Sequence, residues 1–276
     1  MEQQKRVYPA KRNHNRLASA VLLVVSALIV ASGLISRREP GSFFLERVLP
    51  ETPPPLEESF DETMTEAMVE LPANTWYALQ VGAFENRETA LQSASAFQKR
   101  GAAGYLWQDG RYRVLAAAYP SQQDAQQVRE QLRNQHDIDS YLYAIQFPAV
   151  SMRLTGMQGQ IEILQAAFVH AGDLAVQLQA LSVQMDRQEI SSAEAVERLS
   201  ALQTQIELVA LRLRQRFDAP VHATVRALLK CFEDYSQFAA AFSSNESAVA
   251  MGMKLKYQLF VTLQRIQDVY DTLNHT

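Results

Sequence analysis

The side chains best suited to binding chemistry lie in two alternating runs of the sequence, around Gln80 and Arg113. Alternate residues of a strand share one face of a sheet, so each run can present amide or guanidinium groups beside apolar and aromatic side chains. Such a face suits a polar polymer with hydroxyl groups and flat sugar rings, and an ordinary solvated sheet face is the alternative. The candidate contact residues are Trp76, Gln80, Gln108, Arg111, Arg113, Leu115, Tyr141 and Tyr143.

Metal and covalent chemistry have little support in the sequence. Cys231 is the only cysteine of the chain, which excludes an internal disulfide and a cysteine-based zinc site. The adjacent acids Glu233 and Asp234 diverge by about 100° on a helix, so they cannot converge on one substrate. We therefore expect no catalytic residue, no metal and no cofactor. The histidines of the C-terminal half are scattered, without helical metal-ligand spacing: His170, His222 and His275.

The candidate residues belong to a segment, 74–147, with an internal repeat at an offset of 35 residues. Each half begins with an alternating strand and continues into a helix, with Asn86 and Ser121 at the helix starts. Asp109-Gly110 predicts a two-residue hairpin between the halves, and residues 140–146 predict a last strand. The order βαββαβ indicates an α+β, ferredoxin-like (RNP-like) domain with both helices on one face of an antiparallel sheet. The repeated positions are Tyr77, Leu79, Val81, Phe84 and Ala90, then Tyr112, Val114, Ala116, Tyr119 and Ala125.

Alternation also predicts which side chains the helix-free face displays. A two-residue hairpin pairs Trp107 with Tyr112, which places Trp107 in the core beneath the helices and leaves Leu106 and Gln108 outward. The last strand has two interpretations, with either Tyr141 and Tyr143 or Leu142 and Ala144 outward. The residues expected outward on the two repeated strands are Trp76, Ala78, Gln80, Gly82, Arg111, Arg113 and Leu115.

The segment from Trp76 to about Gln146 resembles a SPOR domain. The resemblance rests on the run Trp76-Tyr77-Ala78-Leu79-Gln80-Val81-Gly82-Ala83-Phe84, with Asn86 and Ala90, and on Tyr112-Arg113-Val114, with Tyr119 and Ala125. The chain departs from the family at Ala117-Ala118-Tyr119, where Gly-Pro-Phe is usual. The resemblance implies binding of bacterial peptidoglycan, chiefly glycan strands stripped of stem peptides, across the open sheet face. Gln80 is the residue carried over most directly, and Arg113 and Leu115 follow by position.

The N-terminal part predicts a membrane anchor. Residues 1–16 carry a net charge of +4, and residues 17–35 contain no charge and would span roughly 28 Å as a helix. The positive-inside rule then leaves residues 1–16 in the cytoplasm and the rest outside; a cleaved signal peptide is the less favoured alternative. Residues 36–73 form an acidic, proline-containing linker. This plan is similar to that of cell-division proteins of the FtsN type, which places the protein in the bacterial cytoplasmic membrane as a single-pass, septum-enriched protein.

Residues 148–276 show a helical period and predict an all-α antiparallel helical bundle, either alone or completed by a second copy. Ser191 and Glu194 form a capping box at the start of one helix, and Pro220 opens another. The first helix starts near Val150, in a region that glycines weaken. The bundle is a candidate docking surface for another envelope protein of the division machinery or for a second copy of the chain.

Three functions fit these features. The first is a non-catalytic, membrane-anchored protein that binds glycan strands at division or sporulation septa. The second is a wall-remodelling enzyme with a catalytic glutamate in the helical domain, and the third is an envelope scaffold with a degenerate SPOR domain. Nucleic acid is not an expected partner, because segment 74–147 has seven basic and seven acidic residues and lacks the strand signature of RNA-recognition modules.

Overall fold

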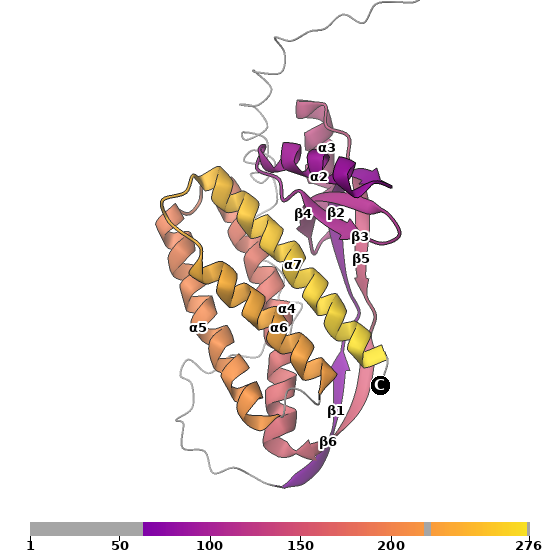
Figure 1. Cartoon of the computed structure of the whole chain (residues 1–276), viewed down its shortest axis with the longest axis vertical. Coiled ribbons are helices and arrows are strands. Elements are labelled where there is room, and N and C mark those ends of the chain that lie inside the picture. Colours follow the sequence, from indigo (N-terminus) through magenta and orange to yellow (C-terminus); the bar gives the residue numbers. More distant parts are fainter. Residues whose placement is uncertain (1–62, 218–221, 275–276) are drawn as a thin grey trace, which may run out of the picture.

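The computed structural model describes residues 63–217 and 222–274 (Figure 1). The expected cytoplasmic tail (1–16), membrane span (17–35) and most of the linker lie outside the described residues. Within the described ranges, none of the helices combines the length and the apolar character needed to cross a membrane.

The predicted βαββαβ domain is confirmed. It consists of β2 (Asn74–Phe84), α2 (Arg87–Gln98), β3 (Tyr105–Gln108), β4 (Tyr112–Tyr119), α3 (Gln122–His136) and β5 (Tyr141–Phe147). The strand order is β3-β4-β2-β5, and all neighbours are antiparallel. Both helices pack on one face and are capped as expected. Asn86 accepts hydrogen bonds from the amides of Glu88 and Thr89, and Ser121 accepts one from Asp124.

The β3–β4 hairpin differs from the prediction by one residue. Gln108 pairs with Tyr112, so the loop contains three residues, with Gly110 at a φ of +85°. Trp107 therefore lies opposite Arg113, on the helix-free face, and Leu106 packs under α2. The prediction that placed Trp107 under the helices and Leu106 outward is wrong, because a one-residue change of register turns every side chain of a strand to the other face.

Irregularities in β2 and β4 also change the face pattern. The register shifts on both sides of Gln80, and the consecutive residues Ala116 and Ala117 both pack in the cluster that contains α3. Beyond the second shift, Ala83 lies opposite Arg113. Ala83, rather than Gly82 as predicted, therefore continues the face that carries Arg113.

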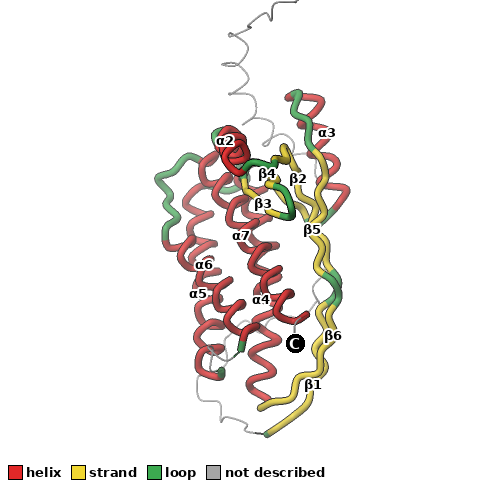
Figure 2. The backbone as a smooth tube through the Cα atoms, turned by 45° about the vertical axis from the view of Figure 1, so that its right-hand side comes forward, coloured by secondary structure: helices red, strands yellow, loops and turns green. Residues whose placement is uncertain are grey.

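A two-stranded ribbon extends the sheet. It pairs β1 (Met64–Leu71) with β6 (Val150–Met157), and Figure 2 shows it running beside the bundle. Part of the expected linker and the expected start of the first bundle helix are thus strands. Pro72 and Pro148 lie at the junction between ribbon and sheet, where their missing N–H groups interrupt the ladder.

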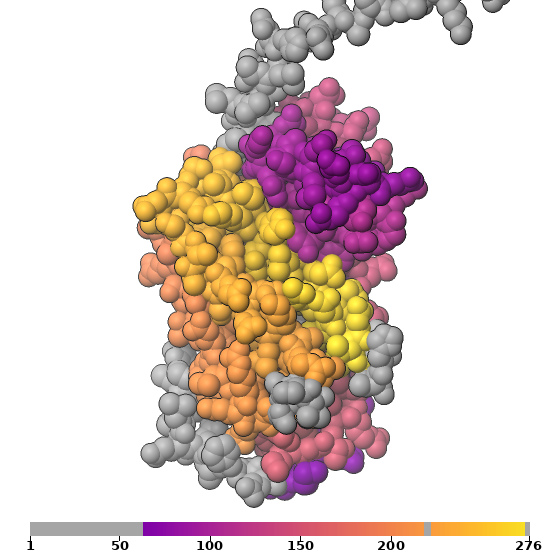
Figure 3. Space-filling view, in the orientation of Figure 1, coloured from indigo at the N-terminus to yellow at the C-terminus, as the bar shows by residue number. Residues whose placement is uncertain are grey.

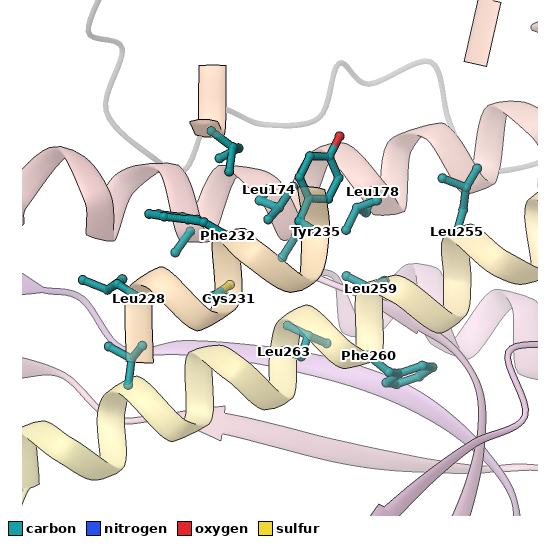
Figure 4. Packing of buried hydrophobic residues seen from close by; sticks show 14 of the residues in the cluster. Leu174, Leu178, Leu228, Cys231, Phe232, Tyr235, Leu255, Leu259, Phe260 and Leu263 are labelled. Carbon is teal, nitrogen blue, oxygen red and sulfur yellow. The ribbon is translucent and has the colours of Figure 1, made fainter. Parts of the chain in front are cut away.

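The helical region is a four-helix bundle of α4 (Gln158–Asp186), α5 (Ser192–Arg216), α6 (Ala223–Ala240) and α7 (Ala248–Asn274), in which successive helices run antiparallel (Figure 1). Ser191 and Glu194 form the predicted capping box, and Pro220 lies outside the described residues. The core is filled from within one chain. Leu174, Leu178, Phe232 and Leu259 are among the buried side chains shown in Figure 4.

The bundle covers the part of the sheet face that the domain's own helices leave open. Trp76 and Leu115 are 2% and 0% exposed, and they belong to one continuous apolar cluster with α4 and α7. Phe147 meets Tyr270 of α7 at a ring-centroid distance of 5.4 Å, and Tyr105 stacks on Phe260 at 5.4 Å. The sheet and the bundle therefore share one core, and the expectation of a fully open face is wrong for its larger part.

A buried ion pair ties the two parts together at the α2–β3 loop. The ammonium group of Lys256, on α7, donates to Asp186 at the end of α4 at 2.7 Å and to the carbonyl of Gly101 at 3.1 Å. Lys256 is 3% exposed, so these partners take the place of water around its ammonium group. Burial raises the pKa of Asp186, although Lys256 opposes that shift.

We predict that Trp76→Ala lowers the free energy of unfolding by about 3–5 kcal/mol, because it leaves a cavity in the shared core. In urea unfolding of the unaltered full-length protein, tryptophan fluorescence and far-ultraviolet circular dichroism should report the same single transition. The same measurement on Trp76→Ala gives the loss of stability. The matched control is Tyr141→Ala, because Tyr141 is an exposed aromatic residue of the same sheet. This substitution should change the free energy of unfolding by less than about 0.5 kcal/mol. Two separate transitions would contradict the shared core.

Lys256→Met should destabilise the protein by about 3–5 kcal/mol, because the carboxylate of Asp186 remains buried without its partner. Adding Asp186→Leu should restore much of this loss, since both buried charges are then removed. Thermal unfolding of the single and double variants measures the coupling. Additive losses in the double variant would show that the ion pair does not hold the junction.

Candidate functional site

A polar cluster occupies the end of the helix-free face that the bundle leaves uncovered. It joins Gln80 of β2, Arg113 of β4, Tyr143 of β5 and Asp109 of the β3–β4 loop. We call these four residues the Arg113 cluster. Four separate segments supply it, so the βαββαβ topology is what brings the residues together.

Arg113 is held from three sides. Its Nε lies 2.8 Å and 2.9 Å from the two carboxylate oxygens of Asp109, and one terminal nitrogen donates to Gln80 Oε1 at 2.8 Å. The guanidinium carbon lies 4.7 Å from the ring centroid of Tyr143, within the range of a cation–π contact. The Tyr143 hydroxyl donates to Asp109 at 2.8 Å. The guanidinium is therefore fixed before any ligand arrives.

The protonation states of the cluster follow from these contacts. Partial burial alone would raise the pKa of Asp109, but hydrogen bonds from Arg113 and Tyr143 outweigh it and lower that pKa below its ordinary value. Burial, aided by the hydrogen bond to Asp109, raises the pKa of Tyr143 to about 12. At neutral pH, Asp109 is thus an anion and Tyr143 a hydrogen-bond donor.

The structure brings four of the eight predicted contact residues to one place. Gln80, Arg113 and Tyr143 belong to the Arg113 cluster. Tyr141 lies opposite Gln80 with 69% of its surface exposed. This pairing decides between the two interpretations of the last strand, because Leu142 packs on the side of the helices.

The other four predicted contact residues lie elsewhere. Trp76 and Leu115 are on the predicted face but are buried under the bundle. Gln108 pairs with Tyr112 and is exposed toward α2, and Arg111 is exposed in the hairpin loop. Trp76 and Leu115 are buried because the bundle packs on them. The positions of Gln108 and Arg111 differ from the prediction because the hairpin loop has three residues.

Asp109 is the cluster residue that sequence reasoning missed. Its Asp-Gly context identified it only as a turn residue. The available signal was the short spacing to Arg113, because the first residue of a three-residue hairpin loop lies close to the start of the strand that follows.

Residues 73–144 match the family model of the SPOR domain. This is a SPOR domain. The match covers about a quarter of the chain and implies peptidoglycan binding by a non-catalytic domain. No curated protein and no solved structure matches the chain.

Neither a metal centre nor a buried catalytic acid is present in the part of the chain that the structure describes. No group of three histidine, cysteine, aspartate or glutamate side chains there could hold a metal ion. The fully buried polar residues in the described ranges are Ser182, Lys256, Gln258 and Thr262, with no glutamate among them, and the largely buried Asp186 is paired with Lys256. The cavity between the SPOR sheet and the bundle is about 50 Å³, too small for a saccharide. The described residues therefore give the wall-remodelling hypothesis no support.

The lowered pKa of Asp109 predicts how Arg113 responds to acid. A carboxylate with a depressed pKa in the folded state keeps its interaction above its ordinary pKa of 3.8 and loses it as the pH falls through the lower value. The Arg113 Nε–H resonance should therefore stay protected from solvent exchange at pH 4 and above, and lose protection below. In Asp109→Ala it should exchange rapidly at every pH, with a stability change under about 1 kcal/mol because the pair is partly exposed. Rapid exchange in the unaltered protein at neutral pH would contradict the geometry.

Proposed function

We propose that this protein is a membrane-anchored, non-catalytic protein that binds glycan strands of peptidoglycan through the Arg113 cluster and Tyr141. The observation that carries the proposal is the fixed guanidinium on the uncovered end of a SPOR sheet. The predicted span at 17–35 would hold the protein in the bacterial cytoplasmic membrane, with the SPOR domain facing the wall at division or sporulation septa.

The chemistry of the cluster fits strands from which stem peptides have been removed. Hydrolysis of the amide between sugar and peptide leaves a carboxylate on the glycan. A guanidinium that is already oriented by Asp109 and Gln80 can pair with such a carboxylate at a small entropic cost. The exposed ring of Tyr141 and the amide of Gln80 supply a flat surface and hydrogen-bonding groups for the sugar beside it.

The envelope scaffold remains a second candidate function because of one observation. The bundle buries the larger part of the sheet face, including Trp76 and Leu115. A strand lying across the whole face would collide with α4 and α7. In the scaffold hypothesis the SPOR domain serves as a structural base for the bundle, whose outer surface then meets an envelope partner or a second copy.

Co-sedimentation of the full-length protein with purified sacculi, before and after amidase treatment, tests the proposal. We expect amidase treatment to increase the pelleted fraction. Arg113→Ala should weaken binding at least about tenfold, since a charge-assisted hydrogen bond contributes about 1.5–3 kcal/mol. Gln80→Ala should weaken it less, because it removes a neutral partner.

Arg133→Ala is the matched control, because Arg133 is an exposed arginine on α3, away from the cluster. Arg113→Lys keeps the charge but loses the planar fork, so it should bind between the unaltered protein and Arg113→Ala. No pelleting of the unaltered protein with either form of sacculus would favour the scaffold.

A further inference from the structure

A groove of about 400 Å³ lies beside the free edge of β3, between α2 and α7. Figure 3 shows the SPOR domain and α7 in direct contact on this side of the molecule. Its volume falls within the range of small-molecule and saccharide sites. The SPOR domain supplies most of the lining, and Tyr257 of α7 completes it, so both parts of the chain contribute to the groove.

Aromatic rings in fixed positions line this groove. Tyr257 is 39% exposed and meets Tyr105 edge-on at a centroid distance of 5.1 Å. Tyr105 in turn stacks on Phe260, which is fully buried. Burial, with a further contribution from Tyr257, raises the pKa of Tyr105 to about 12, so its hydroxyl remains a hydrogen-bond donor. Exposed rings held in this way can pack against the apolar face of a sugar.

Polar groups surround these rings. The side chain of Gln98 donates to the carbonyl of Ala103 at 3.2 Å, which holds its amide in the groove wall. Gln108 and Arg87 line the same groove and are exposed. Amide and guanidinium groups around aromatic rings suit a hydroxyl-rich ligand better than an apolar one.

The groove adjoins the Arg113 cluster at the β3–β4 hairpin. Gln108 of the groove is the residue directly before Asp109 of the cluster. Beneath them, Trp107 lies 6.4 Å from Tyr105 and 6.5 Å from Tyr143, measured between ring centroids. Tyr105, the buried Trp107 and Tyr143 therefore form a row of ring contacts between the groove lining and the Arg113 cluster.

We propose that this groove is a second glycan subsite, in which a strand bound at the Arg113 cluster passes Gln108 and places a sugar against Tyr257. The inference rests on the proposed function, since it extends the same ligand. The bundle then closes the central part of the sheet face and gives the strand a different path at its edge. Tyr257 contributes binding from outside the SPOR domain.

The test compares peptide-free glycan strands of two lengths, a tetrasaccharide and a strand of about a dozen sugars. Binding to the full-length protein is measured with each. Tyr257→Ala should weaken binding of the long strand about threefold to tenfold, the usual size of one aromatic contact, and leave the tetrasaccharide unchanged. Gln108→Ala, at an exposed position that bears no core packing, should show the same length dependence. Leu211→Ala, an exposed residue on α5, is the control that changes neither.

The outcomes separate this inference from the proposed function. If Tyr257→Ala and Gln108→Ala bind the long strand as well as the unaltered protein does, and Arg113→Ala still loses binding, the subsite is overturned and the proposed function stands. Equal losses on both strand lengths would also overturn the subsite. The two groove variants are also compared on sacculi that retain their stem peptides. If Tyr257→Ala and Gln108→Ala lose binding only to these sacculi, the groove binds stem peptide and the sugar assignment is overturned. Failure of the unaltered protein to bind either strand would remove the proposed function itself.

Discussion

The contact between the apolar part of the SPOR sheet and helices α4 and α7 is the constraint on which the structure depends. A βαββαβ sheet covers one face with its own helices and leaves the other to solvent. Here that other face carries Trp76, Leu115, Ile145 and Phe147, and burial of such surface contributes about 25 cal/mol per Å². The bundle supplies the missing layer, so the SPOR domain and the helical region form one hydrophobic core rather than two modules joined by a linker.

This constraint divides the sheet face into two parts with different roles. The apolar part serves stability, and the part that remains exposed carries Gln80, Arg113, Tyr141 and Tyr143. The same contact brings Tyr257 to the edge of β3, where it joins residues of the SPOR domain in lining a groove. The bundle therefore reduces the part of the sheet face that is exposed to solvent, and it contributes Tyr257 to the groove at the edge of the sheet.

Local patterns were sufficient to predict most elements but not their assembly. The repeat, the caps at Asn86 and Ser121 and the box at Ser191 depend on residues a few positions apart, and all were predicted. The face of Trp107 was predicted wrongly, because Asp109-Gly110 favours a two-residue loop whereas the hairpin uses three residues, and the loop length decides the register. Trp76 is buried by α4 and α7, whose residues are about 100 or more positions away in the sequence. A local hydrophobic pattern cannot predict such a contact. Asp109 was missed because its partner lies across that same turn.

A shared core also determines how the molecule would respond to a bound strand. A flexible linker between a wall-binding domain and a bundle would let each move independently. Here Lys256 fixes the α2–β3 loop to α4 and α7, and the ribbon continues β2 and β5 along the bundle. A force applied at the Arg113 cluster passes through packed side chains and paired strands, which deform little. The described residues begin at the distal end of the ribbon, so the full length of β1 separates that end of the chain from the sheet that carries the Arg113 cluster.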